Sequence, residues 1–159
     1  MLKLSRQGII LALIVGISIN MSLTMAENTT IRAQAGSEAQ YFNLTNTLWG
    51  HYNEDLSYSS NVLNKYVHKN ITRQEALEEM TSAIVLNSLT MDTIAELNPP
   101  GKYERYNENT INAFEYFKEY LHNLAKFYQT GNSAYAIEAM SLFNKSIEYH
   151  DNAIESQIV

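Results

Sequence analysis

The sequence predicts an all-α protein, an antiparallel up-down-up-down four-helix bundle preceded by an N-terminal signal or membrane helix. Three observations support this prediction. Apolar residues recur at alternating steps of three and four in four segments of similar length between residues 37 and 159. Helix-breaking residues, Pro99 and Pro100 among them, separate the segments. The chain opens with basic residues followed by an apolar run, the order found in secretory signals.

Residues 1–26 are predicted to be a signal peptide or a signal anchor. Lys3 and Arg6 precede an apolar run over residues 8–19, and a more polar stretch follows up to Ala26. We expect cleavage after Ala26, because serine, threonine and asparagine dilute the apolar span. If the segment is retained, its basic residues stay in the cytoplasm and it anchors the chain in the membrane. In either case the rest of the protein is expected outside the cytoplasm, secreted or anchored.

The composition of the remaining chain favours one packed domain and restricts its partners. Residues 27–36 are polar and lack periodicity, so they are predicted to link the leader to a bundle over residues 37–159. Without residues 1–26 the chain loses two of its eleven basic residues and none of its seventeen acidic ones, which leaves a net charge of −8. This balance argues against nucleic acid as a partner. Cysteine is absent, so the core alone must stabilise the fold.

The first helix is expected over residues 37–69 and the second from Thr72 to about Asn98. The first has two interleaved sets of residues seven apart, as in a bundle helix: Phe42, Trp49, Leu56 and Leu63 with Thr45, Tyr52, Ser59 and Tyr66. Thr72 and Glu75 have the spacing of a capping box, in which each side chain accepts from the other residue's backbone N–H. The seam of the second helix is formed by Leu77, Met80, Ile84, Asn87, Met91 and Ile94.

The third helix is expected over residues 103–129 and the fourth over residues 133–157, with Gly131 as a left-handed residue between them. The third seam consists of Tyr103, Asn107, Thr110, Phe114, Phe117, Leu121, Leu124 and Tyr128. The fourth consists of Ala136, Met140, Phe143, Ile147, His150 and Ile154. A flank of Tyr116, Tyr120 and Phe127 beside the third seam either widens the core or offers a stacking surface. The short connections predict antiparallel neighbours.

Three histidines are weak candidates for metal ligands: His51, His122 and His150. Carboxylate-bridged metal sites in bundles use two Glu-x-x-His motifs. Only one such motif is present, from Glu119 to His122, and on the helical wheel both residues point away from the third seam. We therefore predict neither a metal nor another cofactor.

The other two histidines have structural explanations. His150 lies on the fourth seam, where we expect it at the edge of the core, hydrogen-bonded to Asn87 or to a tyrosine. Asn87 is itself a polar residue at an apolar seam position, a device that fixes register at some cost in stability. His51 and Asp55, four apart on the first helix, are expected to form a local pair.

No catalytic residue is predicted, and one surface is predicted to bind a partner. The chain has no nucleophile elbow and no glycine-rich phosphate loop, so we do not expect an enzyme. Val85, Leu86 and Leu89 lie on the side of the second helix that should face water. We predict an interface there with a partner protein, a second subunit or the retained N-terminal helix. The alternative is that these residues are ordinary scattered surface aliphatics.

The leading hypothesis is a non-enzymatic interaction or accessory module outside the cytoplasm. A second hypothesis is a ligand-sensing bundle similar to the periplasmic four-helix sensor domains of bacterial receptors, which would have to pass its signal to another protein. A metal-binding bundle is the third. Sequons outside the leader make Asn28, Asn43, Asn70 and Asn144 candidate glycosylation sites in a host with the machinery.

Overall fold

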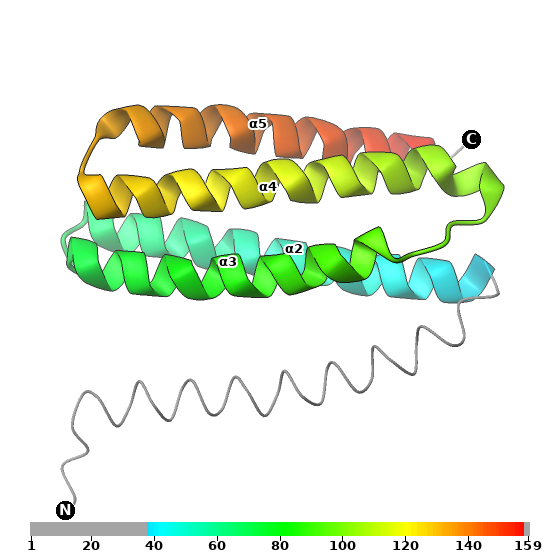
Figure 1. The fold of residues 1–159 in the computed structure, drawn as a ribbon, viewed down its shortest axis with the longest axis horizontal. Coiled ribbons are helices and arrows are strands. Elements are labelled where there is room, and N and C mark those ends of the chain that lie inside the picture. The colour runs from blue at the N-terminus through cyan, green and yellow to red at the C-terminus, as the bar shows by residue number, and fades with distance from the viewer. Residues whose placement is uncertain (1–37, 158–159) are drawn as a thin grey trace, which may run out of the picture. The chain divides into compact units, whose positions relative to one another are not determined.

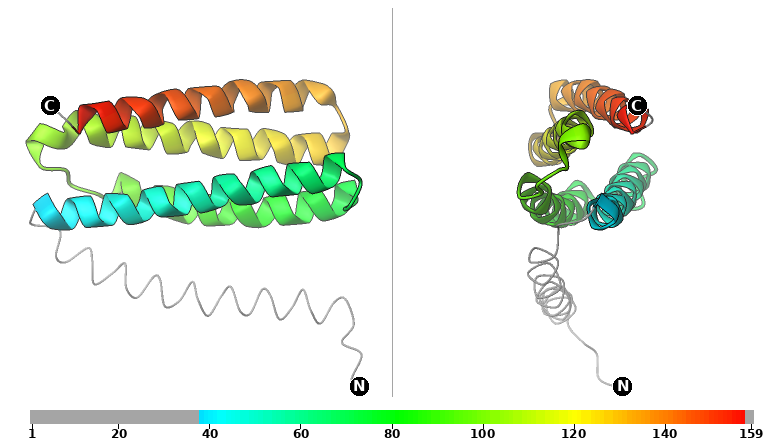
Figure 2. Two further views of the ribbon diagram at one scale, coloured as in Figure 1. Left: turned by 180° about the vertical axis from the view of Figure 1, so that it is seen from behind. Right: turned by 90° about the vertical axis from the view of Figure 1, so that its right-hand side faces the viewer.

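The computed structural model describes residues 38–157, and this part of the chain is all-helical. Its elements are α2 (Glu38–Val67), α3 (Arg73–Ala95), the short 3-10 helix η1 (Gly101–Tyr103), α4 (Glu104–Thr130) and α5 (Ser133–Ser156). Figures 1 and 2 show the four long helices side by side, each joined to the next at one end. No strand occurs within residues 38–157, so the predicted all-α class is confirmed. The predicted leader 1–26, linker 27–36 and sequon at Asn28 lie outside the described residues.

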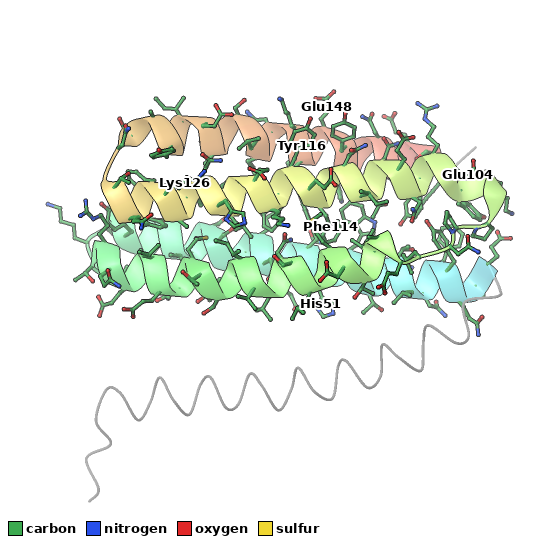
Figure 3. All side chains as sticks on the ribbon, viewed as in Figure 1. His51, Glu104, Phe114, Tyr116, Lys126 and Glu148 are labelled. Atoms are coloured by element: carbon green, nitrogen blue, oxygen red, sulfur yellow. The ribbon has the colours of Figure 1, made fainter. Side chains whose placement is uncertain are left out.

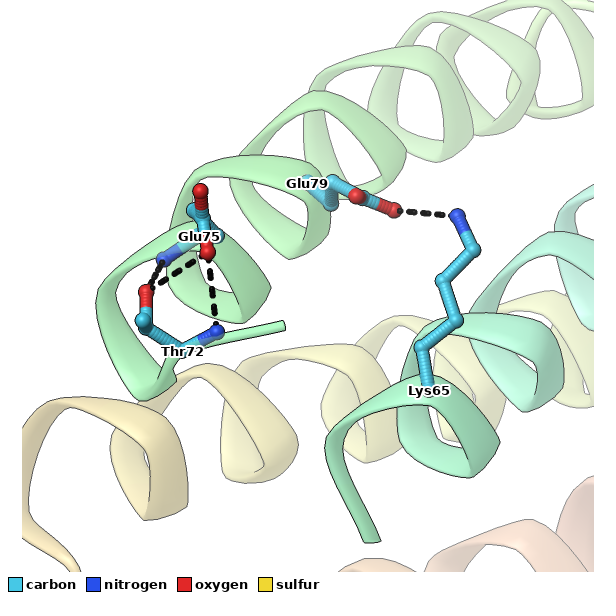
Figure 4. A network of polar contacts seen from close by, with 4 residues as sticks. All are labelled: Lys65, Thr72, Glu75 and Glu79. Atoms are coloured by element: carbon cyan, nitrogen blue, oxygen red, sulfur yellow. Dashed lines mark hydrogen bonds and ion pairs between the residues drawn. The ribbon is translucent and has the colours of Figure 1, made fainter. Parts of the chain in front are cut away.

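The helix boundaries agree with the predicted ones to within three residues, because local signals set them. At the start of α3 the Thr72 hydroxyl accepts from the Glu75 backbone N–H at 3.2 Å, and the Glu75 carboxylate accepts from the Thr72 N–H at 2.9 Å. Figure 4 shows this capping box beside the ion pair of Lys65 and Glu79. Gly131 follows α4 with φ of 76°, and its N–H donates to the Phe127 carbonyl at 2.7 Å. The predicted capping box at the start of α3 and the predicted left-handed glycine at the end of α4 are both confirmed.

The end of α2 uses a left-handed residue that is not glycine. Lys69 has φ of 60°. Its N–H donates to the Tyr66 carbonyl at 2.9 Å, and the Asn70 N–H donates to the Lys65 carbonyl at 2.8 Å. This pair of bonds is a Schellman motif, which satisfies carbonyls that the helix leaves open. A lysine in this conformation has a steric cost that glycine would not have.

The main core lies where aromatic and aliphatic side chains of α2, α3 and α4 meet. Its fully buried members include Tyr52, Val62, Ala76, Met80, Ala83, Phe114, Phe117, Leu121, Leu124 and Tyr128. A smaller cluster of Tyr41, Tyr106 and Ala153 lies near the start of α2. The predicted seam of α4 is confirmed, because seven of its eight positions are buried and Tyr103 is half-buried.

The predicted seam of α5 is only partly right: Phe143 packs against the core, but none of the six seam residues is fully buried. The residues of α5 that are buried are small ones seven apart, Ala139, Ser146 and Ala153, whereas Met140 and Ile154 are exposed. Small residues let two helix backbones approach closely, and α5 accordingly packs most extensively against α4. The Ser146 hydroxyl even reaches the Ala113 carbonyl of α4 at 2.7 Å. Met140, Phe143 and His150 lie on the side of this contact that faces α2, whereas Tyr149 stacks on Tyr116 of α4.

Candidate functional site

The predicted interface residues on α3 are exposed to different degrees. Val85 and Leu86 are 47% and 41% exposed, and Leu89 is half-buried. We call these three residues the α3 patch. Residues 80–91 of this helix contain no charged side chain. The centres of protein interfaces are depleted in charged residues, and this stretch shares that property.

A second candidate surface lies between α2 and α5, which contact each other differently along their length. In one half, the Tyr52 hydroxyl and the Ser146 hydroxyl are 2.6 Å apart, and the Trp49 ring meets the His150 ring edge-on with centroids 4.7 Å apart. The Trp49 indole N–H also donates to the Tyr106 hydroxyl at 3.0 Å. These aromatic side chains fill the space between α2, α4 and α5 at this level.

In the other half, α2 and α5 leave a pocket of about 340 Å³ between them. Residues of α2, α4 and α5 line it: Ser60, Leu63, Asn64, Val67, Tyr120, Met140 and Phe143. Two rim residues stand out into water, because Val67 is 64% and Met140 50% exposed. Tyr120 was expected on a flank that is either core or stacking surface. Its ring is buried in the main core, so Tyr120 widens the core, and it also lines the pocket.

Asp55 is a buried carboxyl group on the core side of α2. Its side chain is on the same helix stripe as Leu48 and Val62, seven residues away on either side, and the residue is 8% exposed. Burial disfavours the charged form, and the neighbouring Glu54 adds repulsion, so the pKa of Asp55 is raised to about 7. The expected pair of His51 with Asp55 is wrong. His51 lies 3.7 Å from Glu54 instead, and both of these side chains are exposed.

Asn87 is fully buried, as its seam position predicted. Neither its amide nitrogen nor its amide oxygen has a hydrogen-bond partner among the described residues. The expected contact of His150 with Asn87 is therefore wrong. The His150 imidazole instead packs against the rings of Trp49 and Tyr52, with Nδ1 3.2 Å from the Asp151 carboxylate.

The three histidines do not come together as ligands. His51 points away from the bundle, as Figure 3 shows. His122 is half-buried on α4, with its partner Glu119 in the sequence motif exposed. Within residues 38–157, no group of three or more histidine, aspartate or glutamate side chains is arranged to hold a metal ion.

The remaining candidate positions lie on the surface or outside the described residues. Asn43, Asn70 and Asn144 are exposed, so their side chains are accessible to modification. Among the helices within residues 38–157, none has the length and apolar character needed to cross a membrane.

Comparisons with known proteins give no relative. No family model, no curated protein and no solved structure matches the chain. The function must therefore be inferred from the surfaces of the bundle itself.

Proposed function

We propose that the protein is a non-enzymatic interaction or accessory module outside the cytoplasm, an up-down-up-down bundle that residues 1–26 export or anchor. It binds a protein partner through the α3 patch. The observation that supports this most directly is the exposure of Val85 and Leu86 within an uncharged stretch of α3. Covering these side chains removes apolar surface from water, and no charge has to be desolvated at the centre of the contact.

A pair of glutamates in the α3 patch tests this function. The full-length protein carrying Val85→Glu and Leu86→Glu is captured from its native membrane fraction alongside the wild type. We expect the stoichiometric partner of the wild type to be lost, because association would bury two charges. The matched control is Asn46→Glu with Thr47→Glu, two adjacent exposed residues of α2, and it should keep the partner. Equal recovery with both variants would sink the proposal.

Ligand sensing is the alternative function, and the pocket between α2 and α5 is the observation that bears on it. Its seven lining residues include the hydroxyl and amide groups of Ser60, Asn64 and Tyr120 but no charged side chain. Such a lining suits an apolar molecule rather than an ionic one. Two of the lining residues, Val67 and Met140, are at least half exposed, so the pocket would enclose a small ligand poorly, and an interaction with protein is the better supported function.

A further inference from the structure

The contact between α2 and α3 has a polar residue at the middle of each buried stripe. Each helix carries a stripe of three buried residues seven apart, which are Leu48, Asp55 and Val62 on α2 and Met80, Asn87 and Ile94 on α3. Residues with this spacing share one face of a helix. The two end members of each stripe are apolar and belong to the main core. The middle members are a carboxyl group on α2 and an amide on α3.

An ion pair sets the register of the two stripes. Figures 1 and 2 show α2 and α3 side by side and joined at one end, and near that end Lys65 Nζ lies 3.4 Å from the Glu79 carboxylate. Away from the shared turn, Asp55 lies ten residues from Lys65, and Asn87 lies eight residues from Glu79. At 1.5 Å per residue these steps are about 15 Å and about 12 Å along the helices. Asp55 and Asn87 therefore lie within one helical turn of the same level, and we call them the polar layer.

Neither side chain of the polar layer is compensated. Asn87 is fully buried, and its amide nitrogen and oxygen have no partner among the described residues. The carboxyl group of Asp55 is 8% exposed and forms no hydrogen bond or ion pair within residues 38–157. An unpaired buried charge costs more free energy than an unpaired buried amide. The closed contact therefore favours the neutral, protonated form of Asp55.

Ionisable groups on the neighbouring helices do not change this conclusion. Those closest to the level of Asp55 are Glu79 and Asp92 on α3, Glu115, Lys118, Glu119 and His122 on α4, and Lys145 and His150 on α5. Burial, and then repulsion by Glu54 of the same helix, raises the pKa of Asp55 to about 7. Histidine side chains also change charge between about pH 5 and pH 8, so substitutions are needed to separate them from Asp55.

The middle of α3 is held to the bundle by few buried side chains. Within this helix, Asn87 is the one fully buried residue between Ala83 and Ile94. Ile84 and Met91 pack against the core but are only half-buried. A segment with few buried apolar contacts opens at a lower free energy than the rest of its domain. We therefore expect residues 84–91 to open before the other parts of the α2 and α3 contact.

We propose that the polar layer is a proton-dependent switch: when Asp55 loses its proton, residues 84–91 of α3 separate from α2 while the rest of the bundle stays folded. Water then solvates the new carboxylate and the Asn87 amide together. The closed form is most favoured in acid and becomes less favoured as the pH rises to neutral, because the proton stabilises only the closed form. The α3 patch lies on the same segment, so its binding of a partner should weaken with rising pH. This last consequence rests on the proposed function, whereas the switch does not.

Native-state hydrogen exchange of the purified full-length protein tests the switch. Exchange is followed at about pH 5.5 and about pH 7.5 in low concentrations of urea and corrected for the intrinsic rates. We expect the protection of residues 84–91 to fall at least about tenfold at the higher pH. Their exchange should depend little on urea, because a local opening exposes little surface, whereas the buried amides of α4 should exchange through urea-sensitive unfolding. Equal urea dependence in α3 and α4 would mean that the whole bundle opens at once, and would overturn the switch.

Substitutions assign the effect to the polar layer. In Asp55→Asn the protection of residues 84–91 should change less than about twofold between the two pH values. Glu115→Gln, at an exposed position of α4, is the control and should keep the tenfold fall. Asn87→Leu should raise the protection at both pH values and keep the fall, because it removes the amide but not the titration. A fall that persists in Asp55→Asn would belong to a histidine and would overturn the proposal.

Capture of the partner at the same two pH values tests the consequence for the α3 patch. We expect the wild type to recover less partner at about pH 7.5 than at about pH 5.5, and Asp55→Asn to recover equal amounts. Equal recovery by the wild type, with residues 84–91 open at the higher pH, would show that the switch does not regulate the patch. Recovery of no partner at either pH would count against the proposed function and leave the exchange result unchanged.

Discussion

Asp55 should make the protein less stable as the pH rises from acid to neutral. Its pKa is about 7 in the folded chain against 3.8 for an aspartate side chain in water, so between these pH values the folded state holds a proton that the unfolded state releases. The contribution of Asp55 to the free energy of unfolding is therefore most favourable below about pH 4. It falls between pH 4 and 7 and stays low above pH 7. A difference of about three pKa units at 1.36 kcal/mol each corresponds to roughly 4 kcal/mol at pH 8, of which about 1.7 kcal/mol is already lost at pH 5. That is a large part of the stability of a small domain.

The substitution that isolates this effect is Asp55→Asn, which keeps the shape and removes the titration. Urea unfolding of both proteins is measured at pH 5 and at pH 8. We expect the advantage of Asp55→Asn over the wild type to grow by about 2.5 kcal/mol between the two pH values. Glu115→Gln, at an exposed position of α4, is the control, and its difference from the wild type should change little with pH. If the Asp55→Asn advantage is the same at both pH values, the carboxyl is not buried as described.

Two further substitutions test the backbone and the core by urea unfolding. Lys69→Gly should stabilise the protein by roughly 0.5 to 1 kcal/mol. Glycine relieves the strain at φ of 60°, and this gain is partly offset because glycine also adds freedom to the unfolded chain. A loss of stability would mean that contacts of the lysine side chain outweigh the strain. Asn87→Leu should stabilise it by about 1 to 2 kcal/mol, because a fully buried amide without a partner is replaced by an apolar side chain of similar size. A destabilised Asn87→Leu protein would show that the amide is satisfied when folded.

The sequence predicts the boundaries of the helices well, but it predicts less well which face of each helix is buried. Boundaries follow from local chemistry, such as the capping box of Thr72 and Glu75 or the left-handed Gly131, and these act within one turn. Which face is buried depends on the neighbouring helix. For α4 the largest apolar residues mark the buried face correctly. For α2 the set of residues seven apart that includes Leu48 and Val62 also includes Asp55, and the charge of that residue hides the pattern.

The pocket follows from the rotation of α5, which a search for large apolar residues cannot detect. Because Ala139, Ser146 and Ala153 lie against α4, Met140, Phe143 and His150 of α5 are turned toward α2. At the level of Trp49 and Tyr52, aromatic rings are long enough to span the distance between α2 and α5, and they meet Ser146 and His150 there.

Farther along, the α2 residues that line the pocket are aliphatic or short and polar: Ser60, Leu63, Asn64 and Val67. Among the described residues, no hydrogen bond or ring contact joins residues 60–67 of α2 to residues 137–143 of α5. The small residues seven apart in α5 are therefore the sequence signal for the pocket, and their consequence is an apolar surface between this half of α2 and α5.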